Sequence, residues 1–248
     1  MRFASVFSGI DVFALVAEEF GWEVIFQCEK DAYCQKVLDR HYPNSAKYGD
    51  IRKFDARCWH GAIDLLAGGD PCQPSSSAGK KKGQNDERYL WPEMHRIIRE
   101  CRPGWIVNEN VAGTISNGIL DRKIDDLENE GYTCWAPILV PANTVGAWHI
   151  RKRVFLVAHT DAHRWNRVLC RRLERIPDPN PQDYALDPRG NPFLQFEQSV
   201  GKPAVLGVDD GTPNRVQRLG AVGNAIHADV VRAIFSSIIN YIHEVQKK

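Results

Sequence analysis

The chain of 248 residues carries a net charge of +1, and 43% of its residues are hydrophobic. This length and composition predict one large globular core, and the near-neutral balance excludes a molecule that attracts a polyanion over its whole surface. No apolar run reaches the roughly 18 residues of a membrane span. The N-terminal stretch is interrupted by Asp11, Glu18 and Glu19 and does not resemble a signal peptide.

The seven cysteines are an odd number, and no two of them have C-x-x-C spacing. This pattern predicts reduced thiols in a cytoplasmic protein rather than a disulfide framework or a zinc site. We expect six of the cysteines to be buried as small hydrophobic residues, and Cys72 to be the exception because of its neighbours.

Strand and helix patterns alternate over residues 1–160. This order predicts an α/β fold with a doubly wound, Rossmann-like and mostly parallel sheet. Two final apolar runs, 133–142 and 152–159, have no helix between them, so we expect them to form an antiparallel hairpin at the sheet edge. Strands are expected at 2–8, 23–29, 62–70 and 104–111, and helices at 11–21, 31–43, 90–103 and 117–132.

The composition changes after residue 160. Residues 161–212 contain six of the fourteen prolines and show little periodicity, which predicts a small irregular insert. An amphipathic pattern over 228–246 predicts a long helix, so segment 213–248 is expected to return to the domain formed by residues 1–160.

The residues after the first expected strand have features of a cofactor site. In an open α/β sheet a cofactor binds at the carboxyl ends of the strands, and Gly9 allows a ligand to approach the backbone. Glu29 suits ribose hydroxyls, and Asp50 with Ile51 could grip and cover an adenine ring. Because no G-x-G-x-x-G is present, an adenosine compound without phosphates is favoured over a dinucleotide. The plain alternative is that Gly9 is only a turn and Glu29 a solvated acid.

Cys72 is flanked by Pro71 and Pro74, which restrict the backbone on both sides. Such stiffness suits a nucleophile whose direction of attack matters. A run of three lysines at 80–82, bracketed by glycines, would favour the thiolate and could close over a substrate. The alternative interpretation of the lysine run is a solvated loop tip.

Four blocks, PCQPSSSAGKKKGQNDER, NENV, RKRVFLVA and LGAVGNAI, follow one another along the chain. Together they resemble the C5-cytosine DNA methyltransferase family over residues 3–159 and 213–235. The resemblance implies a Rossmann-like methyltransferase, S-adenosylmethionine as methyl donor, no metal and double-stranded DNA as substrate. It also implies a monomer of the compact kind carried by phages and prophages, acting in DNA modification, with the insert as the target-recognition segment.

The resemblance further implies covalent catalysis on a cytosine that is flipped out of the duplex. Cys72 matches the thiolate that adds to C6, which makes C5 reactive toward the sulfonium methyl group. Glu109 matches the acid that holds N3 and the exocyclic amine. Arg151 is expected to point toward cytosine O2, and Arg153 to support the neighbouring loop.

Two sets of binding residues follow from the resemblance. The cofactor set comprises Phe7, Ser8, Gly9, Ile10, Asp11, Glu29, Lys30, Asp50, Ile51, Asp70, Pro71, Leu90, Asn224 and Ala225. The DNA set comprises Gln73, Ser76, Lys80, Lys81, Lys82, Arg88, Arg153, Arg164, Arg167 and Arg171. The arginines of the insert suit phosphates or guanines, although a solvated basic helix is the alternative.

Some positions depart from the pattern of the family. Asp11 and Val12 stand where glycines are usual, and Asp11 could contact the ammonium group of the cofactor. His149 stands in place of a glutamine and His227 in place of a proline. These departures leave weak activity or a different methyl donor as open alternatives.

Three other functions remain as alternatives. The first is the same chemistry on RNA, and the second is a DNA-binding protein of the same fold without activity. The second would be expected to lose Cys72, Glu109 or Arg151, and all three are present. The third is an NAD-dependent oxidoreductase, which the missing phosphate-binding glycines disfavour.

Overall fold

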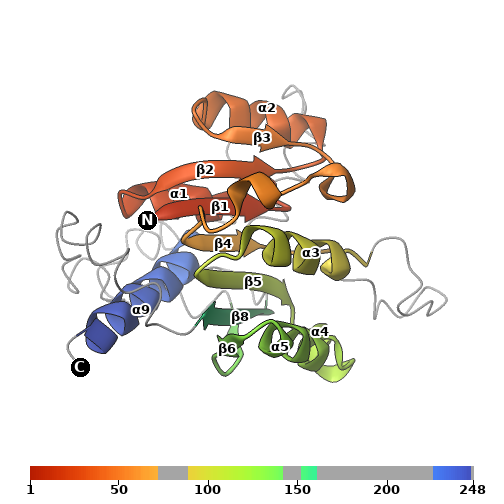
Figure 1. Ribbon diagram of the computed structural model, residues 1–248, viewed down its shortest axis with the longest axis vertical. Helices are drawn as coiled ribbons and strands as arrows, with labels where there is room; N and C mark the ends of the chain where they lie inside the picture. The colour runs from red at the N-terminus through yellow and green to blue at the C-terminus, as the bar shows by residue number, and fades with distance from the viewer. Residues whose placement is uncertain (72–88, 142–151, 161–225, 247–248) are drawn as a thin grey trace, which may run out of the picture.

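The computed structural model describes residues 1–71, 89–141, 152–160 and 226–246 (Figure 1). Its centre is a sheet with the strand order β3-β2-β1-β4-β5-β8-β6, in which β7 also pairs with β8. The strands are β1 Arg2–Val6, β2 Glu23–Cys28, β3 Ala46–Tyr48, β4 Leu65–Gly68, β5 Trp105–Val111, β6 Tyr132–Cys134, β7 Ile138–Pro141 and β8 Lys152–Thr160.

The first five strands along the chain are parallel to one another, and β8 is antiparallel to its three neighbours. The predicted doubly wound and mostly parallel sheet is therefore confirmed. The two last runs are antiparallel as expected, but the run at 133–142 forms two short strands. Both pair with β8, because its nine residues are long enough to bond β6 at one end and β7 at the other. Since β8 also pairs with β5, it lies inside the sheet and not at its edge.

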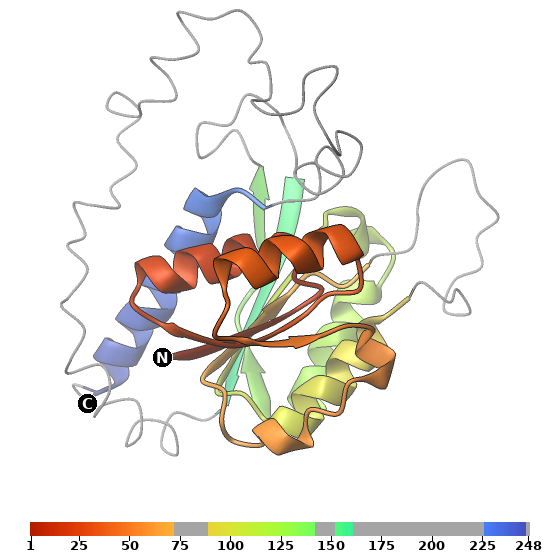
Figure 2. The same ribbon diagram turned by 90° about the horizontal axis from the view of Figure 1, so that it is seen from above.

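Helices cover both faces of the sheet (Figure 2). One face packs against α1, α2 and α9, and the other packs against α3 and α5. The helices are α1 Val12–Glu19, α2 Ala32–His41, α3 Trp91–Cys101, α4 Gly113–Ser116, α5 Ile119–Asn129 and α9 Ala228–Gln246, with short 3-10 turns at η1 Ile51–Lys53 and η2 Arg57–Trp59.

The long helix α9 returns to the sheet, as its amphipathic pattern predicts. Phe235 of α9 packs against the rings of Phe3 and Phe13, and its neighbours complete the core on this face. The expected helix over 117–132 is α5, and a separate short helix, α4, precedes it. Gly118 between the two helices has a φ of 73°, a left-handed conformation that ends one helix and begins the next.

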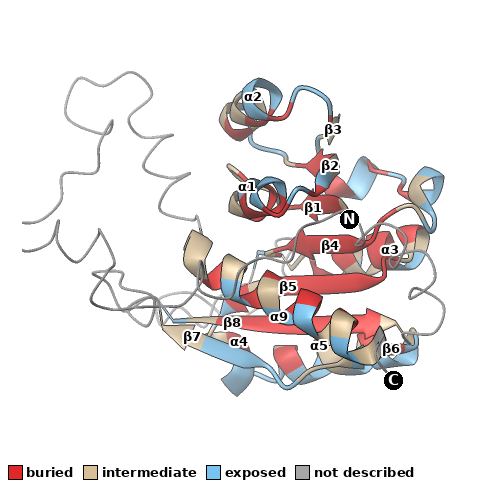
Figure 3. Cartoon of the chain, turned by 90° about the vertical axis from the view of Figure 1, so that its left-hand side faces the viewer, coloured by how far each residue is buried: buried red, intermediate tan, exposed pale blue. Residues whose placement is uncertain are grey.

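The central strands β1, β4, β5 and β8 are largely buried, whereas β7 and the outer faces of the helices are more exposed (Figure 3). The side chains of β5 alternate between the two faces. Trp105 and Val107 pack in the core beside α1 and α9, and Ile106 packs in the core beside α3 and α5. By this alternation Glu109 continues the first face, and Asn108 continues the second.

The parallel strands β1, β2, β4 and β5 end at the same edge of the sheet. This edge therefore brings together the turns that follow these strands, which are far apart in the sequence. Among the described residues, no helix has the length and apolar character required to cross a membrane.

Candidate active site

The turn after β1 has an unusual backbone. Phe7, Gly9 and Asp11 all have positive φ angles, of 54°, 57° and 58°. A side chain at Gly9 would be strained by this angle, but a Cβ atom there would meet no described atom within 4 Å. The backbone at Gly9 thus borders open space within the described structure, which fits the close approach of a ligand.

The carboxylate of Glu29 ties this turn to the end of β2. Glu29 Oε2 accepts a hydrogen bond from the backbone N–H of Gly9 at 2.7 Å, and Oε1 accepts one from the N–H of Asp31 at 2.7 Å. The structure therefore brings Gly9 and Glu29 together, as a cofactor site requires. Each oxygen retains a lone pair that can accept a hydroxyl hydrogen.

Asp50 lies at the start of the next turn, before the buried Ile51. Its carboxylate accepts hydrogen bonds from Arg52, with Nη2 at 2.6 Å from Oδ2, and lies 3.9 Å from Lys30 Nζ. The Arg52 side chain and backbone N–H hold the pKa of Asp50 well below its ordinary value. Asp50 is therefore ionised at neutral pH and remains an acceptor.

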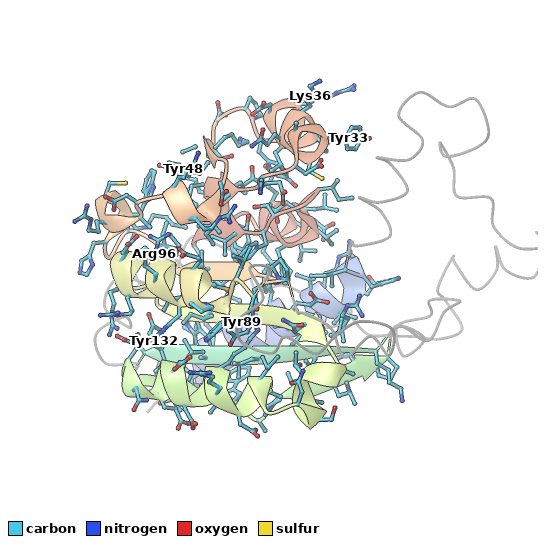
Figure 4. All side chains as sticks on the ribbon, turned by 90° about the vertical axis from the view of Figure 1, so that its right-hand side faces the viewer. Tyr33, Lys36, Tyr48, Tyr89, Arg96 and Tyr132 are labelled. Carbon is cyan, nitrogen blue, oxygen red and sulfur yellow. The ribbon has the colours of Figure 1, made fainter. Side chains whose placement is uncertain are left out.

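Arg96, on α3, fixes the turn that follows Asp50, and the sequence patterns did not indicate this role (Figure 4). Its guanidinium donates to the carbonyl oxygens of Ile51 at 2.7 Å and Phe54 at 2.9 Å. Glu100 pairs with the same guanidinium at 2.8 Å. The ring of Phe54 stacks on Tyr48, with the centroids 3.8 Å apart. A long side chain on a later helix thus holds the wall of the expected adenine site.

The structure gives Asp11 a different environment from the one expected. Its side chain caps α1 by accepting from Ala14 N at 2.9 Å, and it also accepts from Ser5 and Gln27 at 2.6 Å each. Asp11 is buried, and this burial raises the pKa of its carboxyl to about 6. These contacts explain why aspartate is tolerated at this left-handed position, because its short side chain bonds locally. Because Asp11 is only 2% exposed, an ammonium group could reach its carboxylate only if this turn changed its conformation.

Glu109 lies near the end of β5 and meets Arg153 of β8. Arg153 Nε is 2.5 Å from Glu109 Oε1, and the two side chains are 18% and 14% exposed. Gly69, after β4, adjoins the other oxygen, because a Cβ atom at this glycine would lie 2.7 Å from Glu109 Oε2. Arg153 was expected to support a neighbouring loop and to contact DNA, but the structure places it against the acid.

Asp70 belongs to a buried polar network (Asp70, Asn108, Asn110 and Lys123) on the other face of β5. Lys123 Nζ lies 2.5 Å from Asp70 Oδ1, and both side chains are 1% exposed. Asn108 Nδ2 donates to the same oxygen at 2.8 Å, and Asn110 Nδ2 donates to the backbone carbonyl of Asp70 at 3.1 Å. Asp70 was expected to contact the cofactor, yet its carboxylate is directed into the protein, while the following Pro71 is exposed.

Three further expected cofactor residues, Ser8, Ile10 and Leu90, are among those that the structure describes. Ser8 hydrogen-bonds Ser5, with the two hydroxyl oxygens 2.7 Å apart, while Ile10 and Leu90 are half-buried. His227, just before α9, lies 3.4 Å from Asp229, so the departure at this position has a local partner.

Several expected site residues lie outside the described residues. They are Cys72, Gln73, Ser76, Lys80, Lys81, Lys82, Arg88, His149, Arg151, Arg164, Arg167, Arg171, Asn224 and Ala225. The insert at 161–212 also lies there. Their assignments remain predictions.

The cysteines test one expectation directly. Cys28, Cys34 and Cys101 are buried, as predicted, and burial raises the pKa of Cys28 to about 12. The expectation was wrong for Cys58, which is exposed because it lies in the surface turn η2, and Cys134 is only half-buried. In the described part of the chain, no group of three or more His, Cys, Asp or Glu side chains could hold a metal ion.

Comparison with known proteins identifies this architecture. The model of the C-5 cytosine-specific DNA methylase family matches residues 1–190. The chain therefore belongs to the C-5 cytosine-specific DNA methylase family, as the four sequence blocks predicted. Type II methyltransferase M.NgoMIV of Neisseria gonorrhoeae is 34% identical over 180 residues, which cover 66% of this chain and 55% of that protein. Type II methyltransferase M.HhaI of Haemophilus parahaemolyticus is 32% identical over 161 residues, covering 63% and 48% respectively.

Solved structures agree on the fold. A structure of a protein assigned as a DNA modification methyltransferase, encoded within a prophage of E. coli, is 26% identical with a TM-score of 0.54. It matches 64% of this chain and 47% of that chain. The Dnmt2 methyltransferase of S. pombe also has a TM-score of 0.54, over 64% of this chain and 51% of that one, and at 18% identity it supports the fold alone. The chain spans about half the length of these relatives.

Proposed function

We propose that this protein is a DNA cytosine-C5 methyltransferase that uses S-adenosylmethionine. The observation that carries the proposal is the acid at the end of β5, where Glu109 faces Arg153 next to Gly69. The segment that bears Cys72 begins at the end of β4, and β4 pairs with β5. The fold therefore suits a thiol and an acid that act on one base.

The turns at the carboxyl ends of β1, β2 and β3 fit an adenosine-containing methyl donor. Glu29 has lone pairs for ribose hydroxyls, and ionised Asp50 can accept from an adenine amine next to the apolar Ile51. We assign Phe7, Ser8, Ile10, Lys30, Pro71, Leu90, Asn224 and Ala225 to the same site. Asp11 and Asp70 are assigned to its support, since both carboxylates face inward. When bound, S-adenosylmethionine supplies an electrophilic methyl group.

The residues of this chain would have three tasks in the reaction. The Cys72 thiolate would add to C6 of a flipped-out cytosine, which gives C5 the nucleophilicity that the ring otherwise lacks. The Glu109 carboxyl group, in its protonated form, would donate its proton to N3 as the thiolate adds, and it would accept from the exocyclic amine. Arg153 would fix the orientation of this carboxyl group. Arg151 would approach O2. Loss of the C5 proton and departure of the thiol would then restore the aromatic ring.

Segment 161–212 is proposed as the target-recognition insert, with Arg164, Arg167 and Arg171 as candidates for phosphate or base contacts. The lysines at 80–82 with Gln73, Ser76 and Arg88 are proposed to contact DNA beside the flipped base. The methylated sequence would depend on these two segments.

Bisulfite sequencing of plasmid DNA from cells that express the chain tests the proposal. We expect protected cytosines in one short sequence context, and none with Cys72→Ser. The purified wild-type chain should also form a covalent adduct with an oligonucleotide that carries 5-fluorocytosine when the methyl donor is added. Unmodified DNA together with no adduct would overturn the proposal. Methyl transfer to RNA but not to DNA would show that the substrate is RNA.

A further inference from the structure

The buried polar network holds the segment that leads to Cys72. Asp70 Oδ1 accepts three hydrogen bonds, from Lys123 Nζ at 2.5 Å, from Asn108 Nδ2 at 2.8 Å and from Asn110 Nδ2 at 3.3 Å. Within the described residues, Asp70 Oδ2 is buried and accepts no hydrogen bond, so all three donors meet on one oxygen. The direction of the carboxylate is therefore fixed by donors from β5 and α5.

The network also fixes the backbone at the end of β4. Asn108 Nδ2 donates to the carbonyl of Gly68 at 3.1 Å, and Asn110 Nδ2 donates to the carbonyl of Asp70 at 3.1 Å. Backbone pairing between β4 and β5 reaches Gly68 and Asn108. The side-chain amides thus continue the connection between the two strands beyond the last paired residues.

Strand β5 connects this network to the acid. Glu109 stands between Asn108 and Asn110 and points to the opposite face of the sheet. The same three residues of β5 therefore hold the stem of residues 68–71 on one face and present the carboxylate on the other. Cys72 follows Asp70 by two residues, at most about 7 Å of chain, and Pro71 restricts the backbone between them.

Lys123 closes the network from α5. Its Nζ also donates to Asn108 Oδ1 at 2.9 Å and lies 4.8 Å from the centroid of the Trp91 ring. A buried ion pair can often be replaced by apolar residues of similar volume without loss of stability, because desolvation offsets the attraction of the charges. Stability alone is therefore a weak reason for a lysine at this position.

We propose that Lys123 is a positioning residue that acts through Asp70. Its ammonium group holds the Asp70 carboxylate against β5, and so fixes the stem of Cys72 relative to Glu109. This inference rests on the proposed function and deepens it, because it assigns a role in the reaction to a residue of α5 outside the four sequence blocks. Lys123 touches neither substrate nor cofactor in this account.

The test compares three variants of the full chain in steady-state and single-turnover methyl transfer. The double variant D70L/K123M removes the ion pair. The side-chain amides of Asn108 and Asn110 keep their backbone acceptors, the carbonyl oxygens of residues 68 and 70. N110A removes one of the two amides that bond the stem and keeps the ion pair. R102M is the matched control. Arg102 also forms an ion pair, with Glu130 just after α5, at a distance of 3.2 Å. This pair lies at the opposite end of β5 from Asp70. The number of active molecules is measured in each case from the end point of adduct formation on 5-fluorocytosine DNA.

We expect D70L/K123M to lower kcat per active molecule on the order of 100-fold, since a misplacement of about 1 Å has that effect on a reaction. N110A should lower kcat about 10-fold. KM for DNA and for S-adenosylmethionine should stay within about threefold in both, and R102M should keep the kcat of the wild type.

Three results would overturn the inference. One is a kcat per active molecule within about threefold of wild type in both D70L/K123M and N110A, and another is an equal loss in R102M. A fall in the adduct end point with an unchanged rate would show a structural role and would also overturn it. If D70L/K123M does not fold, the kcat of N110A compared with that of R102M tests the inference. A wild-type chain that neither transfers methyl groups nor forms the adduct would instead refute the proposed function, and the inference would fall with it.

Discussion

Arg153 Nε lies 2.5 Å from Glu109 Oε1, across the antiparallel pair of β5 and β8. The contact is diagonal, because Glu109 is opposite Phe155 and Arg153 is opposite Val111 in the register of the two strands. Both side chains are mostly shielded from water, so the attraction is screened less than in a surface pair. The carboxylate thus has a fixed orientation before any base is bound.

A double-mutant cycle with E109Q and R153M should show that the two residues act as a unit. Each single variant is expected to lower kcat/KM, and the double variant should lose less than the product of the two losses. We expect a coupling free energy of about 0.5–3 kcal/mol, as for residues in direct contact. Methyl transfer to duplex DNA under single-turnover conditions provides the measurement.

The pair of Arg57 and Asp55 is a control for this cycle. Its atoms are also 2.5 Å apart, but the side chains are 77% and 56% exposed. A cycle on the free energy of unfolding should give little or no coupling there, because water and salt screen the exposed pair. Independent effects of E109Q and R153M on methyl transfer would contradict the role assigned to Arg153.

Gly69 and Gly68 are adjacent glycines whose substitution by alanine should have different consequences. A Cβ atom at Gly69 would lie 2.7 Å from Glu109 Oε2, the end of a side chain, so G69A should displace the acid and lower kcat. A Cβ atom at Gly68 would lie 2.5 Å from the backbone oxygen of Val6, which cannot move easily. We expect G68A to lower the free energy of unfolding by about 1–3 kcal/mol.

Urea unfolding and kcat, measured on both variants, separate the two effects. G69A should lose activity with a smaller loss of stability than G68A. Equal destabilisation by the two substitutions, with no specific loss of kcat in G69A, would show that Gly69 does not make room for the acid.

The sequence alone could predict the order of the elements, because apolar runs and helical patterns are local properties. Glu109 was assigned through its place in a short block that resembles the family, and not from such patterns. The contact between Arg153 and Glu109 was not predicted, since strand alternation puts Arg151 and Arg153 on one face but does not fix which of them reaches the acid. That distance depends on the register between β5 and β8, which the spacing of the residues does not encode.

Lys123 and Arg96 illustrate what sequence patterns miss. Both lie on amphipathic helices, where a charged residue is ordinarily expected on the solvated face. Their buried partners come from segments 53 and 45 residues away in the chain, at Asp70 and Ile51 respectively. The only possible signal was the position of Lys123 on its helix, because Lys123 lies three and four residues from Leu120 and Leu127, which are buried.

Substitution of Glu29 should weaken cofactor binding more than it affects the reaction itself. The carboxylate accepts from Gly9 N and Asp31 N, so E29A removes both the proposed ribose acceptor and the connection between two turns. We expect the Kd for S-adenosylmethionine to rise about 10- to 100-fold, which corresponds to hydrogen bonds to a charged group. Isothermal titration calorimetry measures the Kd.

Glu23 is the matched control for this prediction, since it is an exposed glutamate at the other end of β2. E23A should bind the cofactor with the affinity of the wild type. Unchanged binding by E29A would show that the turn after β1 does not bind the adenosine part of the donor.

Asp11 should make the stability of the fold depend on pH in an unusual direction. Burial raises the pKa of its carboxyl from 3.8 to about 6, so the folded protein prefers the protonated form. The stabilisation is complete below pH 3.8 and is lost as the pH rises through about 6. This difference between the two pKa values corresponds to a change of about 3 kcal/mol in the free energy of unfolding. Relative to D11N, which does not titrate, the wild type should therefore lose about this amount between pH 4 and pH 7.

Asp31 provides the opposite case at the start of the next helix. It caps α2 as Asp11 caps α1, but it is exposed, and hydrogen bonds from the backbone of Cys34 and Tyr33 lower its pKa. Its contribution is present above pH 3.8 and is lost as the pH falls, so the difference between wild type and D31N should grow with pH. Urea unfolding of the three proteins from about pH 2.5 to pH 7.5 tests both signs, because Asp31 titrates below pH 3.8 and Asp11 above it. Parallel curves for the wild type and D11N would mean that the Asp11 carboxyl does not titrate in this range, and that its hydrogen bonds from Ser5 and Gln27 outweigh its burial.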